Sequence, residues 1–133
     1  MTANSARILV VDDDAAVRVS LERVLTTAGY EVEAVCSGID AVRALAACQR
    51  ELVVLDLRMP RLGGLTVLQH VQQSHPDIPV IVMTGFPSIE NAKECIRVGA
   101  FDFLLKPVDP DRVLAVVSRA LTSRPWKLER RES

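Results

Sequence analysis

The sequence has few of the features that mark secreted, membrane or metal-finger proteins. It contains only three cysteines in 133 residues, Cys36, Cys48 and Cys95, and no Cys-x-x-Cys pair, so we expect reduced core thiols rather than disulfides or a zinc site. No apolar run approaches the roughly 18 residues of a membrane helix, and the amino-terminal stretch MTANSAR lacks the apolar core of a signal peptide. We therefore expect a cytoplasmic protein that does not engage a membrane.

The chain also lacks an excess of charge of either sign. Its 16 basic and 17 acidic residues give a formal net charge of −1. Such a balance provides no general attraction for nucleic acid or for anionic lipid, so we expect no direct nucleic-acid binding by this chain. With 133 residues, of which 49% are apolar, the chain is long enough for one domain with a complete core.

Short apolar runs alternate with amphipathic segments along the chain. The unbroken runs at 8–11, 52–55 and 79–83 are typical of strands buried on both faces, whereas the alternating stretch 30–35 favours a strand nearer the sheet edge. A fifth strand is expected at 101–105. The segments that follow these strands carry apolar residues at spacings of three and four, which predicts five helices, over 17–28, 39–46, 65–71, 89–98 and 110–121.

This alternation predicts an α/β fold with a doubly wound, five-stranded parallel sheet, (βα)5, of flavodoxin-like strand order 2-1-3-4-5. The switch point of such a sheet lies between the first and third strands. We expect a disordered amino terminus over 1–6, one domain over 7–121 and a charged tail or linker over 122–133.

Polar residues stand at the carboxyl ends of four expected strands. Asp12, Asp13 and Asp14 follow the first strand and Asp56 follows the third, and Thr84 and Lys106 follow the fourth and fifth. Parallel strands bring these ends to one edge of the sheet, where such folds bind ligands. Asp13 or Asp14 could cap the next helix, and Asp56 alone could simply end a strand. Neither reading accounts for the whole set.

The chemistry of these residues fits phosphoryl transfer. Converging carboxylates repel one another unless a cation is present, and Mg²⁺ suits a site with few direct carboxylate ligands. Thr84 supplies a hydroxyl donor and Lys106 a compact positive charge for phosphate oxygens. Asp56 is then the carboxylate that could act as nucleophile and form an aspartyl-phosphate.

Four segments, ILVVDDD, VVLDLRMP, VIVMTG and GAFDFLLKP, together resemble the receiver domain of bacterial two-component response regulators, over about residues 7–121. This family has a chemotaxis-regulator-like fold, and the segment PSIENAKECIRVGAFDFLLKP is most similar to receivers of the nitrogen-regulation and nitrogen-fixation types. The resemblance implies that Asp56 takes a phosphoryl group from a sensor histidine kinase or a phosphotransfer protein. Such a receiver is a signalling domain rather than an enzyme, with Mg²⁺-dependent autophosphorylation and autodephosphorylation.

The resemblance also implies a role for each residue of the site. Asp13, Asp56 and the backbone carbonyl of Arg58 would hold Mg²⁺, and Asp12 would act mainly through a bound water. Thr84 and Lys106 would contact the phosphoryl oxygens. The bond between Lys106 and Pro107 is expected to be cis.

The resemblance to receiver domains also implies a conformational switch. Phosphorylation would draw Thr84 inward, and Phe103 would rotate into the space left behind; the alternative reading of Phe103 is a plain core ring. The surface of the fourth helix, fifth strand and fifth helix would then change its preference for an output partner or domain, or for a second copy as a homodimer, with transcription as one output.

One position departs from the family pattern, and two others stand where the family adjusts the lifetime of its phosphoryl group. Gly63 stands where many receivers have an aspartate that caps the third helix, so a looser helix start is expected. Arg58 and Phe86 occupy positions that tune the lifetime of the phosphoryl group. We expect Phe86 to hinder an attacking water and so to favour a moderately long-lived phosphorylated state.

Other readings of the same residues are weaker. A haloacid-dehalogenase-type phosphatase would need a second aspartate two residues after its nucleophile, where this chain has Arg58. A flavin or dinucleotide binder would need a glycine- or hydroxyl-rich loop after the first strand, and the acids at 12–14 would repel its phosphate. The complete set of acids, threonine and lysine argues against an interaction module that works without phosphorylation.

Overall fold

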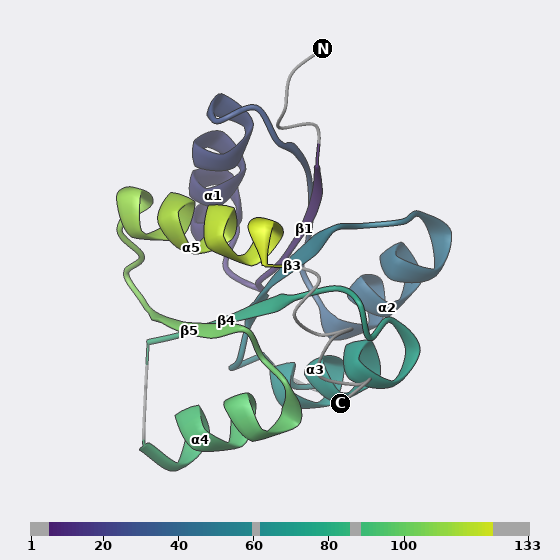
Figure 1. Cartoon of the computed structure of the whole chain (residues 1–133). Coiled ribbons are helices and arrows are strands. Elements are labelled where there is room, and N and C mark those ends of the chain that lie inside the picture. The colour runs from purple at the N-terminus through teal and green to yellow at the C-terminus, as the bar shows by residue number, and fades with distance from the viewer. Residues whose placement is uncertain (1–5, 60–61, 86–88, 124–133) are drawn as a thin grey trace.

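A computed structural model describes residues 6–59, 62–85 and 89–123, and it contains one parallel sheet in the order β2-β1-β3-β4-β5 (Figure 1). The predicted α/β fold class and strand order are therefore confirmed. The strands are β1 (Arg7–Val11), β2 (Glu31–Val35), β3 (Leu52–Asp56), β4 (Val80–Thr84) and β5 (Asp102–Leu105).

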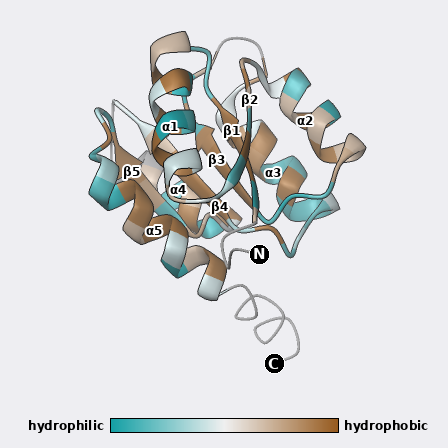
Figure 2. Cartoon of the chain, turned by 90° about the horizontal axis from the view of Figure 1, so that it is seen from above, coloured by the Kyte–Doolittle hydropathy of each residue, from teal (hydrophilic) through white to brown (hydrophobic). Residues whose placement is uncertain are grey.

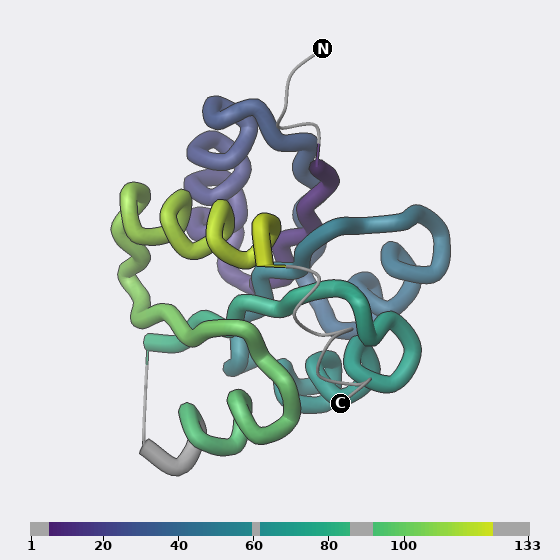
Figure 3. Tube along the Cα trace, in the orientation of Figure 1, coloured from purple at the N-terminus to yellow at the C-terminus, as the bar shows by residue number. Residues whose placement is uncertain are grey.

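Helices cover both faces of this sheet. They are α1 (Ala15–Thr27), α2 (Gly38–Ala47), α3 (Gly64–Ser74), α4 (Ile89–Val98) and α5 (Pro110–Thr122). The tube in Figure 3 shows α1 beside α5 and α2 beside α3, and α3 also contacts α4. The sheet thus forms the middle layer of three.

Alternate residues of each central strand pack into different cores, because successive side chains of a strand point to opposite faces. On β3, Val53 and Leu55 pack with α2, α3 and α4, whereas Leu52 and Val54 pack with α1 and α5. All five residues of β3 and of β4 are buried. Figure 2 shows the result as brown central strands between helices of mixed brown and teal. This double coverage explains the unbroken apolar runs of the sequence.

The starts of α1 and α3 differ in their capping residues. Asp14 caps α1, since its side chain accepts hydrogen bonds from the backbone N–H groups of Ala16 and Val17. The sequence left this cap open between Asp13 and Asp14, and the structure assigns it to Asp14. Gly63 precedes α3 without any side-chain cap, and the looser helix start expected there stays a prediction.

One part of the cysteine prediction is wrong. Cys95 is buried in the core as expected, but Cys48 is half-buried and Cys36 is exposed, because Cys36 follows the edge strand β2 rather than a central strand. All three thiols are free. Among the described residues, no helix is long and apolar enough to cross a membrane.

Candidate functional site

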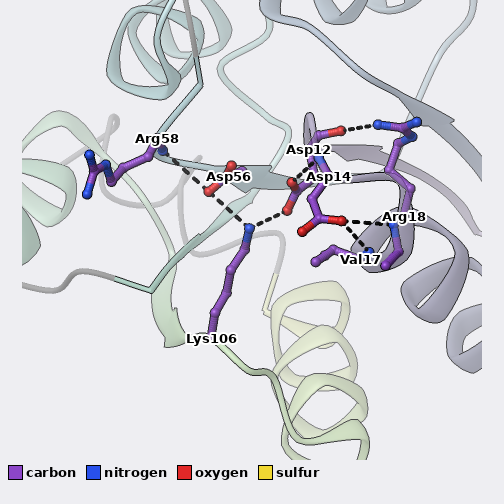
Figure 4. A network of polar contacts seen from close by, with 8 residues as sticks. Asp12, Asp14, Val17, Arg18, Asp56, Arg58 and Lys106 are labelled. Carbon is purple, nitrogen blue, oxygen red and sulfur yellow. Dashed lines mark hydrogen bonds and ion pairs between the residues drawn. The ribbon is translucent and has the colours of Figure 1, made fainter.

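The loops after β1 and β3 leave the sheet side by side. Val11 pairs with Leu55 across the two strands, so Asp12 and Asp56 follow at the same level. Ligand oxygens of Asp12, Asp13 and Asp56 all lie within 4.8 Å of one another. Figure 4 shows Lys106, which directly follows β5, reaching toward Asp12 and Asp56. The structure therefore brings together the acids that the sequence placed at separate strand ends.

Asp12 is completely buried and is fixed through both of its carboxylate oxygens. The backbone N–H of Asp14 donates to Asp12 Oδ1 at 2.9 Å. Lys106 Nζ lies 2.7 Å from Asp12 Oδ2. The backbone N–H of Asp12 itself donates to the carbonyl of Val35 at 3.2 Å, which joins the start of the loop to β2.

Asp56 is the buried acid at the end of β3, with 3% of its surface exposed. Its Oδ1 accepts a hydrogen bond of 3.3 Å from the Arg58 N–H and lies 3.4 Å from Lys106 Nζ. Burial and the neighbouring charge of Asp12 raise the pKa of Asp56 to about 6, against the opposing effects of Lys106 and the Arg58 N–H. The carboxylate is thus costly to ionise without a further cation.

Lys106 bridges two of the acids. Burial alone would lower the pKa of its ammonium group, but the hydrogen bonds and negative charges of Asp12 and Asp56 outweigh burial and raise that pKa. Its backbone N–H donates to the carbonyl of Thr84 at 2.9 Å, which holds the end of β5 against the end of β4. The following bond to Pro107 is cis, as the sequence predicted.

The remaining predicted residues lie around this group. Thr84 ends β4 and is fully buried. Phe103 is half-buried on β5 and packs against the core beneath α2, α3 and α4. Arg58 is exposed at the rim. Phe86 lies outside the described residues, so its expected shielding role stays a prediction.

Two residues of the site were not anticipated from the sequence. A Cβ atom built on Gly64 would lie 2.4 Å from the carbonyl oxygen of Asp56, so only glycine lets α3 begin this close to the end of β3. Arg18 of α1 donates from Nη1 to the carbonyl of Asp12 at 2.8 Å. The glycine pair at 63–64 was a usable signal for the first, whereas nothing in the pattern of α1 marked the second.

The donor set fits a divalent cation. Asp12, Asp13 and Asp56 offer only hard carboxylate oxygens, which are the ligands that Mg²⁺ prefers. Asp12 Oδ2 is buried, and its described contact is the ion pair with Lys106 Nζ at 2.7 Å. This oxygen has room in its bonding capacity for a second partner, such as an ordered water or a cation.

Comparison with known proteins defines the class. The family described as the response regulator receiver domain matches residues 8–118, and the chain belongs to this family. The chain is accordingly a receiver domain of the two-component signalling type. Receiver domains bind Mg²⁺ and work with histidine kinases in general.

Two curated regulators are similar in sequence to this chain. The DNA-binding transcriptional regulator NtrC of Escherichia coli is 39% identical over 115 residues, which cover 86% of this chain and 24% of that protein. The regulatory protein LuxO of Vibrio parahaemolyticus is 40% identical over 112 residues, which cover 84% of this chain and 25% of that protein. The chain therefore spans about a quarter of the length of these curated relatives.

Solved structures show the same fold. NtrX of Brucella abortus, in complex with ADP, has a TM-score of 0.88 at 36% identity, covering 94% of this chain and 29% of that one. A CheY-like receiver domain protein of Methanospirillum hungatei has a TM-score of 0.88 at 28% identity and covers 93% of this chain and 99% of that one.

Proposed function

We propose that residues 7–121 take a phosphoryl group onto Asp56 from the phosphohistidine of a sensor histidine kinase or a phosphotransfer protein. The observation that carries this proposal is the setting of Asp56, a carboxylate that is 3% exposed and lies beside two further acids and a lysine. A carboxyl group whose pKa is raised by burial and by a neighbouring acid supports a functional site.

In the proposed transfer, one oxygen of Asp56 attacks phosphorus while the bond from phosphorus to the donor's histidine nitrogen breaks. The electron pair of that bond remains on the imidazole nitrogen. Asp56 Oδ1 is held by the Arg58 N–H and by Lys106, which leaves Oδ2 as the oxygen for attack. The buried carboxylate meets the donor with its orientation already fixed.

We propose that Asp13, Asp56 and the carbonyl of Arg58 hold Mg²⁺ directly, with Asp12 acting through a bound water. Such an ion, when bound, stabilises negative charge on the phosphoryl oxygens. Lys106 supplies a second positive charge for these oxygens and exchanges part of its contact with Asp12 for the new phosphoryl group. Thr84 donates its hydroxyl to the same group.

The proposed output surface is formed by α4, β5 and α5. Phosphorylation would draw Thr84 inward and let Phe103 follow. This movement would shift the equilibrium between two packings of the surface. Ile96 on α4 is 50% exposed and Leu105 on β5 is 56% exposed, so apolar contact area is available for an output partner, an output domain or a second copy. By analogy with NtrC, transcription is the proposed output, in the cytoplasm.

Intact-mass measurement after incubation with acetyl phosphate and Mg²⁺ tests the proposal. The parent protein should gain one phosphoryl group, and Asp56→Asn should gain none. Asp14→Asn is the matched control, because Asp14 caps α1 and stands outside the three-carboxylate group. The proposal fails if Asp56→Asn is labelled to the level of the parent.

A further inference from the structure

We propose that Arg18 is a positioning residue for the divalent cation site, and that it sets the Mg²⁺ affinity by fixing the turn that carries Asp12 and Asp13. The inference rests on the proposed function, because it concerns the same cation site. Arg18 touches neither Asp56 nor Lys106 in any hydrogen bond or ion pair seen among the described residues, so any positioning effect of Arg18 must pass through the turn.

Arg18 holds the turn on both sides of Asp13. Its Nη1 donates to the carbonyl of Asp12 at 2.8 Å, and its backbone N–H donates to the carbonyl of Asp14 at 3.1 Å. The first of these bonds is visible in Figure 4, where the guanidinium group lies on the side of Asp12 away from Lys106. The second bond is the ordinary backbone bond of the first helical turn, which any residue at position 18 would make, so only the bond to the Asp12 carbonyl depends on the guanidinium group.

The other contacts of the turn leave Asp13 dependent on this backbone. Asp12 accepts from the Asp14 N–H, and Asp14 accepts from the first amides of α1, so the side chains of both neighbours are engaged. Asp13 is exposed, and within the described part of the chain no hydrogen bond or ion pair holds its carboxylate. The direction of that carboxylate thus follows the backbone that Arg18 fixes.

Removing the guanidinium group has two opposite effects on cation binding. Loss of a nearby positive charge favours Mg²⁺ by Coulomb's law, although water screens this effect for a half-exposed side chain. Loss of the hydrogen bond frees the carbonyl of the buried Asp12 and loosens the turn, which disfavours Mg²⁺. Because the bond is short and charge-assisted, the positioning effect should prevail.

The sign of the change in Mg²⁺ affinity tests this inference. Isothermal titration with MgCl₂, without any phosphodonor, should show about fivefold weaker binding for Arg18→Met, which is the scale of one hydrogen bond of roughly 1 kcal/mol. Arg18→Lys should recover part of the loss, because its ammonium group can still donate to the Asp12 carbonyl. Arg23→Met, an exposed position on the same helix, should bind like the parent.

Thermal melting in chelator separates positioning from general stability. Arg18→Lys remains informative if Arg18→Met is too unstable to titrate, since it should fold and bind Mg²⁺ more weakly than the parent. Equal or tighter Mg²⁺ binding by the Arg18 variants would overturn the inference, even if their melting points fall. A parent that binds no Mg²⁺ would overturn it together with the proposed cation site, whereas a parent that binds Mg²⁺ but gains no phosphoryl group would overturn only the proposed transfer.

Discussion

Lys106 Nζ lies 2.7 Å from Asp12 Oδ2, within the acidic group that we propose as the Mg²⁺ site. The ammonium group therefore partly neutralises these carboxylates before any ion binds. The positive charge of Lys106 weakens the attraction of the site for Mg²⁺ and at the same time supplies charge for the incoming phosphoryl group.

Lys106→Met should separate these two effects. We expect tighter Mg²⁺ binding, by severalfold, because the competing positive charge is lost, together with a rate of phosphoryl uptake at least about tenfold lower because one stabilising charge is missing. Titration with MgCl₂ and uptake from acetyl phosphate measure the two quantities. Lys93→Met, at an exposed position on α4, is the control and should change neither. Weaker Mg²⁺ binding by Lys106→Met would contradict this view of the lysine.

The raised pKa of Asp56 predicts a pH-dependent loss of stability without divalent cations. Burial raises this pKa from the ordinary 3.8 to about 6, so the folded protein binds the proton more tightly than the unfolded chain does. The corresponding stability is present at low pH and is lost as the pH rises through about 6.

Asp56→Asn should remove this loss, because its side chain stays neutral. In chelator at pH 8 we expect the variant to melt about 3 °C or more above the parent, with a smaller difference at pH 5. Mg²⁺ should raise the melting point of the parent more than that of the variant. A parent that is as stable as Asp56→Asn at pH 8 in chelator would show that the ionised carboxylate carries no such penalty.

The close approach of α3 to β3 gives a second test by substitution. Gly64→Ser should destabilise the protein by about 2 kcal/mol or more and lower phosphoryl uptake, because the new Cβ would lie 2.4 Å from the Asp56 carbonyl oxygen and the strand end must shift. Gly63→Ser is matched in chemistry and adjacent in sequence, but its Cβ meets nothing within 4 Å.

Denaturant unfolding and phosphorylation rates distinguish the two serine variants. Gly63→Ser should keep the parental rate and, because serine can cap α3, should be as stable as the parent or slightly more stable. If both variants behave alike, the steric account of Gly64 is incorrect.

The sequence predicted those features of the fold and the site that depend on the pattern of apolar and polar residues. Strand order and the convergence of Asp12, Asp56 and Lys106 follow from apolar runs that each end in a polar residue, because parallel strands place those ends at one edge. The sequence could not show that Arg18 reaches back to the carbonyl of Asp12, since that contact depends on a side-chain conformation across the first turn of α1. The exposure of Cys36 was missed because it directly follows the apolar pair Ala34 and Val35, although β2 lies at the sheet edge.

The most direct test of the central claim is to locate the phosphoryl group chemically. After incubation with acetyl phosphate and Mg²⁺, borohydride reduces an aspartyl-phosphate to homoserine, which marks the acceptor in the peptide sequence. We predict homoserine at position 56 alone, and none in protein kept without the donor. Homoserine at position 12 or 13, or unmodified aspartate at position 56 in protein that has gained a phosphoryl group, would contradict the assignment of Asp56 as the acceptor.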